Sequence, residues 1–414
     1  MRRTLVAVMA MAVITPVALA ACGKGDDDKD ASAWVGTPSA SAGASAAAPT
    51  GREESASVPV SLAVTPAAGK TEVPVSAEIG FKVAGAKVTT VTLKDGAGKP
   101  VAGTLREDGS AWVPSAPLKT KQKYSASVVA TAGDGTTKTA STTFTTMGKP
   151  ARKTGTGLYL FDDHTYGVAM PVVVEFSPGI KKADRAAVQR RMFVTTTPAQ
   201  PGVWSWTPNG TQAYYRGPEF WKSGTTLKVR IALGGLPTGG GRYGDRDRAA
   251  TAKIGRSFEM KVDNKSKKMT VVQDGKTVKT MPVSLGKKGT PSSSGVMVVM
   301  EKKESTVFDT TDTDGDDGYV TDIEFAQRLT WSGQYIHSAP WSVGDQGRRN
   351  VSHGCVNVAP GNARWLFDRT LVGDPVTVRG TEDKLSYGNG WTPWDKPWSE
   401  FVKGSALPVP ASLK

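Results

Sequence analysis

The segment 352–357, Ser-His-Gly-Cys-Val-Asn, contains residue types that nucleophilic catalysis requires. Its Cys355 is one of 2 cysteines in 414 residues, and the other, Cys22, ends an apolar N-terminal segment that is typical of an export signal. An exported protein that retains one unpaired thiol exposes it to oxidation, and the usual reason is that the thiolate acts as a nucleophile. We therefore take Cys355 as the candidate nucleophile.

A base for this thiol is available nearby in the sequence. A cysteine with an ordinary pKa of about 8.5 needs an imidazole or positive surroundings to form a thiolate at neutral pH. The chain has 3 histidines, and both His337 and His353 precede Cys355. His353 is two residues away, too close for easy proton transfer, so we expect His337 to be the base and His353 a supporting residue. Gly354 permits a sharp turn whose amides form an oxyanion hole; an inert buried cysteine is the structural alternative.

The N-terminus predicts export and anchoring. Arg2 and Arg3 precede an apolar run over residues 5–21 that ends in Leu-Ala-Ala before Cys22, which is typical of a secretory signal. The small residues before Cys22 resemble a bacterial lipoprotein cleavage site and imply a lipidated cysteine. A membrane-spanning anchor, which needs about 20 apolar residues, and an ordinary cleaved signal are the alternatives. The Gly-, Ala- and Ser-rich stretch that follows, to residue 57, is expected to be a flexible tether.

Most of the chain has β-type patterns. Residues 58–147 contain short alternating runs separated by Asp-Gly turns, which predicts an antiparallel sandwich. Residues 148–262 repeat this style with more aromatic residues and predict a second sandwich, and neither segment shows a helical period. From Asn264 onward, two β-type runs flank Asp274-Gly275 and predict a hairpin. One short helix is expected over residues 360–368, directly after the cysteine motif. These elements predict a mostly β catalytic domain.

The arrangement of His337-Ser338 followed by segment 352–357 is similar to the signature of the YkuD-type L,D-transpeptidases, cysteine enzymes that remodel bacterial peptidoglycan. The whole chain resembles their actinobacterial lipoprotein members, which have immunoglobulin-like domains. The resemblance implies that Cys355 attacks a donor tetrapeptide stem, releases D-Ala and forms a thioester. An acceptor amine then resolves the thioester, giving a link between third residues. It also implies acylation by carbapenems.

The resemblance assigns roles to individual residues. His337 is the base, Ser338 orients it through the backbone carbonyl, and the amides of His353, Gly354 and Cys355 stabilise the oxyanion. Asn357 supports the site by hydrogen bonding, and the substrate-binding positions are Tyr319, Trp341 and Phe308. The expected organisation is a signal peptide at 1–21, a tether at 22–57, immunoglobulin-like domains at 58–148 and 149–263, a YkuD catalytic domain at 264–381 and a Trp-rich tail, packed on the domains, at 382–414.

No metal or cofactor is expected. His164 has no other histidine or cysteine near it in sequence, so we interpret it as a surface or structural residue. The acidic stretch 309–318 lies where related enzymes have an active-site flap, and it is shorter and more acidic than that flap. It resembles a calcium loop, but aligning Gly315 as the required glycine puts threonines at the first and last ligand positions.

The formal net charge of +14 suits anionic wall polymers and lipid head groups as partners, and export argues against nucleic acid. A generally basic surface without a specific partner is the alternative. The tryptophans of segment 391–398 fit a packed tail better than a glycan-binding platform. Peptidases of the NlpC/P60 type have their cysteine before the histidine, the reverse of the order here. An L,D-carboxypeptidase of the same fold and a non-enzymatic wall-binding lipoprotein remain the alternative functions.

Overall fold

The computed structural model describes residues 59–309, 311 and 320–414. The expected signal peptide and the whole tether, with Cys22, lie outside the described residues, as do Tyr319 and most of the acidic stretch. Within the described ranges, no helix is long and apolar enough to span a bilayer.

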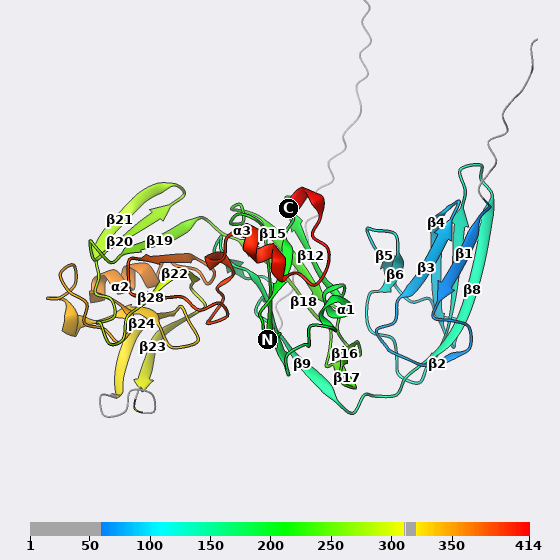
Figure 1. Cartoon of the computed structure of the whole chain (residues 1–414), viewed down its shortest axis with the longest axis horizontal. Helices are drawn as coiled ribbons and strands as arrows, with labels where there is room; N and C mark the ends of the chain where they lie inside the picture. Colours follow the sequence, from blue (N-terminus) through cyan, green and yellow to red (C-terminus); the bar gives the residue numbers. More distant parts are fainter. Residues whose placement is uncertain (1–58, 310, 312–319) are drawn as a thin grey trace, which may run out of the picture. The chain divides into compact units, whose positions relative to one another are not determined.

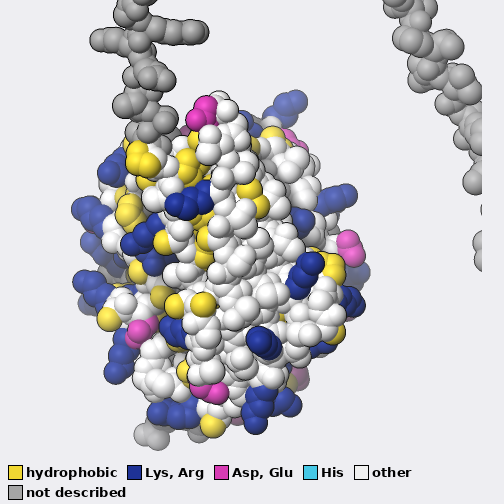
Figure 2. Space-filling model, turned by 90° about the vertical axis from the view of Figure 1, so that its right-hand side faces the viewer, with side chains coloured by type: hydrophobic (Ala, Val, Ile, Leu, Met, Phe, Trp, Pro, Cys, Tyr) yellow, Lys and Arg dark blue, Asp and Glu magenta, His cyan; other side chains and the backbone are white. Residues whose placement is uncertain are grey.

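The first sandwich consists of two four-stranded sheets with the orders β1-β3-β6-β5 and β2-β8-β7-β4. In β7 every second side chain is buried, as expected for a strand with one face on the core. Its Tyr124 stacks on Phe144 of β8, with 5.7 Å between the ring centroids. Figure 1 shows the two sheets facing each other. On the surface, Lys and Arg side chains are spread over the face of the molecule that Figure 2 shows. The strands are β1 (Ser61–Thr65), β2 (Lys70–Val73), β3 (Ile79–Ala84), β4 (Lys87–Asp95), β5 (Gly103–Leu105), β6 (Ala111–Pro114), β7 (Lys123–Thr131) and β8 (Thr137–Thr146).

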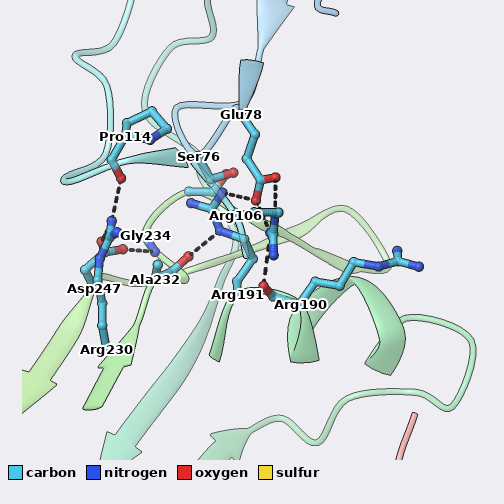
Figure 3. Close-up of polar contacts among 11 residues, drawn as sticks. Ser76, Glu78, Arg106, Pro114, Arg190, Arg191, Arg230, Ala232, Gly234 and Asp247 are labelled. Carbon is cyan, nitrogen blue, oxygen red and sulfur yellow. Dashed lines mark hydrogen bonds and ion pairs between the residues drawn. The ribbon is translucent and has the colours of Figure 1, made fainter. Parts of the chain in front are cut away.

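Polar contacts join the first sandwich to the second (Figure 3). The Glu78 carboxylate accepts hydrogen bonds from both Arg106 and Arg191, and Arg191 also donates to the Ala232 carbonyl at 3.2 Å. Glu78 and Arg106 belong to the first sandwich and Arg191 to the second. The Glu78 carboxylate therefore binds one arginine from each domain.

The second sandwich has a four-stranded sheet, β10-β18-β15-β12, and a six-stranded sheet, β13-β14-β11-β9-β17-β16. It contains one short helix, α1 (Arg185–Gln189), which the sequence did not predict because five residues are too few for a helical period to repeat. The strands are β9 (Lys153–Leu158), β10 (Thr165–Tyr166), β11 (Val172–Ser177), β12 (Met192–Thr197), β13 (Val203–Trp206), β14 (Gln212–Arg216), β15 (Thr226–Ile231), β16 (Pro237–Gly239), β17 (Arg242–Gly244) and β18 (Arg248–Ile254).

The C-terminal tail completes the core of the second sandwich. Trp391 and Phe401 are 3% and 0% exposed and belong to the same apolar cluster as strands β11, β14 and β15. The tail contains short helices, which are η3 (Pro393–Asp395), α3 (Trp398–Phe401), η4 (Val402–Gly404) and η5 (Ala411–Leu413). The Trp-rich segment is therefore part of a hydrophobic core, as expected for a packed tail.

Arg216, at the end of β14, fastens this tail. Its side chain is 2% exposed and donates to the carbonyls of Pro393 at 3.2 Å and Lys396 at 2.8 Å. Burial lowers its pKa to about 10, and within the described ranges no acidic side chain forms an ion pair with it. Its guanidinium lies over three tail rings, those of Trp394, Trp398 and Phe401.

Arg216→Ala should destabilise the protein by about 2–4 kcal/mol, because it removes charge-assisted hydrogen bonds and leaves buried carbonyls unpaired. Urea unfolding followed by tryptophan fluorescence would measure the change. Arg246→Ala is the matched control, since that side chain is 71% exposed. Equal stability of the two variants would contradict the role of Arg216.

The catalytic domain also consists of two sheets, ordered β21-β20-β19-β27-β22-β28 and β23-β24-β25-β26. β20 and β21 form the expected hairpin, with positive φ at Asp274 and Gly275 as a type I′ turn requires. The expected helix is α2 (Pro360–Phe367), which buries Ala363 and Leu366. The strands are β19 (Phe258–Asp263), β20 (Lys268–Gln273), β21 (Lys276–Pro282), β22 (Ser293–Val298), β23 (Glu301–Asp309), β24 (Val320–Arg328), β25 (Tyr335–Ser338), β26 (Val356–Val358), β27 (Pro375–Arg379) and β28 (Asp383–Lys384). The first strand of the catalytic sheet, β19, thus begins at Phe258, before residue 264, where the sequence placed the start of the catalytic domain.

Candidate active site

The candidate base and nucleophile lie on or next to two neighbouring parallel strands. β25 carries His337 and pairs with β26 so that His337 lies opposite Asn357. Cys355 directly precedes β26. The fold therefore places at one pair of strands two residues that the sequence separates by 17 intervening positions.

The Cys355 thiol is buried. The residue is 8% exposed, and its Sγ donates to the Gly333 carbonyl at 3.7 Å. Burial raises the pKa of this thiol to about 12, and the backbone of Tyr335 opposes that shift only in part. The resting nucleophile is therefore a neutral thiol that requires a base at the moment of attack.

His337 is oriented as a base. It is 3% exposed, and its Nδ1 lies 2.8 Å from the Ser338 carbonyl. A carbonyl only accepts, so Nδ1 carries the hydrogen and Nε2 keeps its lone pair. Burial lowers the pKa of this imidazole, although the bond to Ser338 acts in the opposite direction. The backbone carbonyl of Ser338 thus takes the orienting position expected for it.

Alkylation of Cys355 should reveal the neutral thiol. A pKa of about 12, against an ordinary 9.0, reduces the thiolate population at pH 7 about a thousandfold. The rate of labelling by iodoacetamide, followed by intact-mass spectrometry, should rise about tenfold per pH unit from pH 7 to 10. Glutathione is the control: the rate at which iodoacetamide alkylates it should stop rising near the ordinary pKa of a free thiol. A plateau for Cys355 below pH 8 would instead indicate a preformed thiolate–imidazolium pair.

The turn before the nucleophile is held by serine hydroxyls. Gly354 has a φ of +116°, which only glycine adopts readily. Ser352 Oγ donates to the Cys355 carbonyl at 2.7 Å and accepts from the Gly354 amide at 3.2 Å. The half-buried His353 lies within this turn. The Gly354 amide therefore already has an acceptor, and it can bind an oxyanion only by giving up this bond.

The remaining predicted residues surround His337. The ring of Phe308 lies edge-on to the imidazole at 5.6 Å, and that of Trp341 lies at 6.0 Å; Trp341 is 57% exposed. Asn357 Nδ2 donates to Ser342 Oγ at 3.2 Å, whereas its buried Oδ1 has no hydrogen-bond partner among the described residues. These side chains line the imidazole, with Trp341 on the solvent side. Tyr319 lies outside the described residues.

Sequence reasoning missed the turn 330–334 between β24 and β25. Its Gly333 supplies the acceptor of the thiol hydrogen, and Tyr335, next along the chain, packs on Phe308 at 4.6 Å. The Ser332-Gly333 dipeptide is a turn signal that could have located this loop, but nothing in the sequence links it to Cys355. Elsewhere, the Nδ1 atom of the exposed His164 bonds to the Asp162 carbonyl at 2.8 Å, and its ring lies beside those of Phe161 and Tyr166. The described residues contain no cluster of metal-ligand type.

The chain matches two family models. Residues 70–237 match the bacterial Ig domain, and residues 258–378 match the L,D-transpeptidase catalytic domain. The second match covers both strands that carry His337 and Cys355, so the residues of the candidate site lie in a domain of that type.

Three similar proteins carry the same family name. The chain is 34% identical to L,D-transpeptidase 2 of Mycobacterium tuberculosis strain CDC 1551, covering 82% of this chain and 83% of the relative. It is 34% identical to L,D-transpeptidase 5 of strain H37Rv, covering 85% and 78%. A solved structure of the L,D-transpeptidase LdtMt1 in complex with imipenem is 32% identical, with a TM-score of 0.47, covering 56% of this chain and 100% of that one. Because the first two relatives are 34% identical over more than four fifths of this chain, the chain belongs to the L,D-transpeptidase family.

Proposed function

We propose that the protein is a peptidoglycan L,D-transpeptidase that links the third residues of stem peptides through a thioester on Cys355. The observation that carries this proposal is the tautomer of His337. Its Nδ1 is tied to the Ser338 carbonyl, so the lone pair of Nε2 is available for the hydrogen of a thiol on the adjacent strand. Family membership supplies the reaction class, and this geometry supplies the base.

The proposed reaction has two balanced steps. Nε2 of His337 accepts the thiol hydrogen as Sγ attacks the carbonyl between the third residue and the terminal D-Ala of a tetrapeptide. The imidazolium then gives this proton to the departing amine, so D-Ala leaves and a thioester remains. An acceptor side-chain amine attacks the thioester, loses its proton to His337, and the thiol is regenerated. The backbone amides of His353 and Cys355 stabilise the oxyanion in both steps, joined by that of Gly354 once it gives up its bond to Ser352 Oγ.

Intact-mass spectrometry with a tetrapeptide donor tests this function. We expect an adduct equal in mass to the donor minus D-Ala, and loss of that adduct with formation of a cross-linked product when an acceptor stem is added. Release of free tripeptide alone would identify an L,D-carboxypeptidase instead. The absence of any adduct, with the protein shown to be folded, would favour a non-enzymatic wall-binding protein.

Carbapenems are proposed as inhibitors of the same thiol. Their strained amide carbonyl would occupy the position of the donor carbonyl, and ring opening releases no fragment, so the whole drug stays bound to Sγ. The imipenem of the solved relative is consistent with this chemistry but belongs to that protein.

The cellular location is likewise a proposal. Lipidation of Cys22 would anchor the protein to the outer face of the cell membrane, and the net charge of +14 suits a wall rich in anionic polymers. Incorporation of a fatty-acid probe that is lost in Cys22→Ser would support the anchor. Incorporation that persists in this variant would contradict it.

A further inference from the structure

The turn 330–334 is fastened at two separate points. On one side Gln334 exchanges two hydrogen bonds with Ser293: Ser293 N donates to its Oε1 at 3.1 Å, and its Nε2 donates to Ser293 Oγ at 2.9 Å. Ser293 Oγ in turn donates to Asp383 at 2.6 Å. Ser293 and Gln334 belong to the catalytic domain, and Asp383 lies in β28 of its sheet, so this side of the turn is held without the segment around Asn389.

The other side depends on one tail residue. Ser332 N donates to Asn389 Oδ1 at 2.9 Å, and Asn389 Nδ2 donates to Ser332 Oγ at 2.9 Å. The two residues are 57 positions apart, so the contact is purely tertiary. Between these two fastened residues lies Gly333, whose carbonyl accepts the hydrogen of the Cys355 thiol.

The tail on either side of Asn389 is itself held in place. The Gly390 carbonyl accepts a hydrogen bond from Tyr214 OH of the second sandwich at 2.9 Å. The ring of Trp391 lies 5.2 Å from that of Tyr159, which directly follows β9. Asn389 therefore reaches the turn from a backbone that the second sandwich fixes.

We propose that Asn389 is a positioning residue for acyl transfer, which holds the Gly333 carbonyl at the Cys355 thiol. The proposal rests on the proposed function of Cys355. Without Asn389, Ser332 loses both of its bonds to the tail, while Gln334 stays fixed. That side of the turn then depends on weaker local contacts, from the Gly333 amide to the Thr330 carbonyl at 3.4 Å and from Ser332 Oγ to Thr330 Oγ1 at 3.1 Å, so the acceptor of the thiol hydrogen is less firmly placed. The effect should therefore fall on the attack of Sγ and not on the binding of the donor.

Asn389→Ala tests the proposal through two rates. Loss of two hydrogen bonds, each worth roughly a factor of five, should lower the maximal rate of donor acylation by up to about 25-fold, with the half-saturating donor concentration unchanged. Alkylation by iodoacetamide at pH 8 should become several-fold faster, because the thiol is less enclosed. Asn389→Asp keeps the acceptor for the Ser332 amide. Its acylation and alkylation rates should therefore lie between those of Asn389→Ala and the unsubstituted protein.

A double-mutant cycle separates positioning from general damage. Ser332→Ala removes one of the two bonds that Asn389→Ala removes and, in addition, the contact of Ser332 Oγ with Thr330 Oγ1 at 3.1 Å. The two substitutions together should therefore slow acylation by less than the product of their separate effects. Asn209→Ala is the matched control: that side chain also holds a loop, through Thr207 and Thr211 of the second sandwich, and both rates should stay at the unsubstituted value.

The outcomes keep the two proposals apart. Unchanged acylation and alkylation in folded Asn389→Ala would overturn the positioning role. Additive effects in the cycle would also overturn it. Altered alkylation in a protein whose unsubstituted form accepts no donor would support the positioning of the thiol and reject the proposed function. If Asn389→Ala does not fold, Ser332→Ala replaces it as the test variant. It keeps the bond from the backbone amide of residue 332 to Asn389, and the rates of acylation and alkylation are measured in the same way.

Discussion

The Cys355→Ala variant is expected to form no acyl-enzyme with a tetrapeptide donor and no adduct with a carbapenem. The thiol is the sole nucleophile in the proposed mechanism, and removal of a nucleophile from a catalytic group of this kind costs about 10⁶-fold in rate. Intact-mass spectrometry under single-turnover conditions measures both reactions. Since Ala is close in volume and apolar, the buried site of Cys355 should remain folded.

The second cysteine provides the control. Cys22→Ser should leave both adducts unchanged in the purified protein, because Cys22 belongs to the N-terminal signal in our interpretation of the sequence. Cross-linking and carbapenem labelling that both persist in Cys355→Ala would show that the enzyme hypothesis for this thiol is wrong.

The His337→Asn variant is expected to acylate about 10²–10⁴ times more slowly at pH 7, the usual contribution of a general base. An asparagine amide can still donate to the Ser338 carbonyl, but it cannot accept the thiol hydrogen. The variant must therefore wait for spontaneous ionisation of a thiol whose pKa burial raises to about 12. Its acylation rate should increase about tenfold per pH unit between pH 7 and 10.

The unsubstituted enzyme should show a different profile. Burial lowers the pKa of His337 from its ordinary 6.5, so Nε2 stays unprotonated at neutral pH and the acid limb of the acylation rate should have its midpoint below pH 6.5. His164→Asn is the matched control, since that exposed imidazole also bonds through Nδ1 to a carbonyl; its profile should be unchanged. A flat profile for His337→Asn would argue against general-base catalysis.

Local sequence signals were enough for the fold and for part of the site. The two sandwiches, the mostly β catalytic domain and its short helix were predicted, and the fold class is confirmed. The Asp274-Gly275 hairpin followed from turn chemistry alone. The hydrogen bond between His337 and the Ser338 carbonyl joins adjacent residues, so a local sequence motif was enough to predict it.

The features that sequence reasoning missed are tertiary. The raised pKa of Cys355 arises from burial by segments distant in the chain, and the acceptor of its hydrogen, Gly333, comes from another loop. The Asn389–Ser332 contact has no periodic or compositional signal. Helix α1 is too short to produce a pattern. Each of these depends on which parts of the chain meet, and local patterns do not encode that.

The insertion of Trp391 and Phe401 into the core of the second sandwich has a consequence for the order of synthesis. Chains emerge from the ribosome N-terminus first, at about 5–20 residues per second. The strands of this sandwich end at Ile254, yet its last core side chains are made only after the whole catalytic domain. The domain cannot reach its final packing during translation, and a chain that stops before Phe401 leaves a hydrophobic gap for quality-control proteases to recognise.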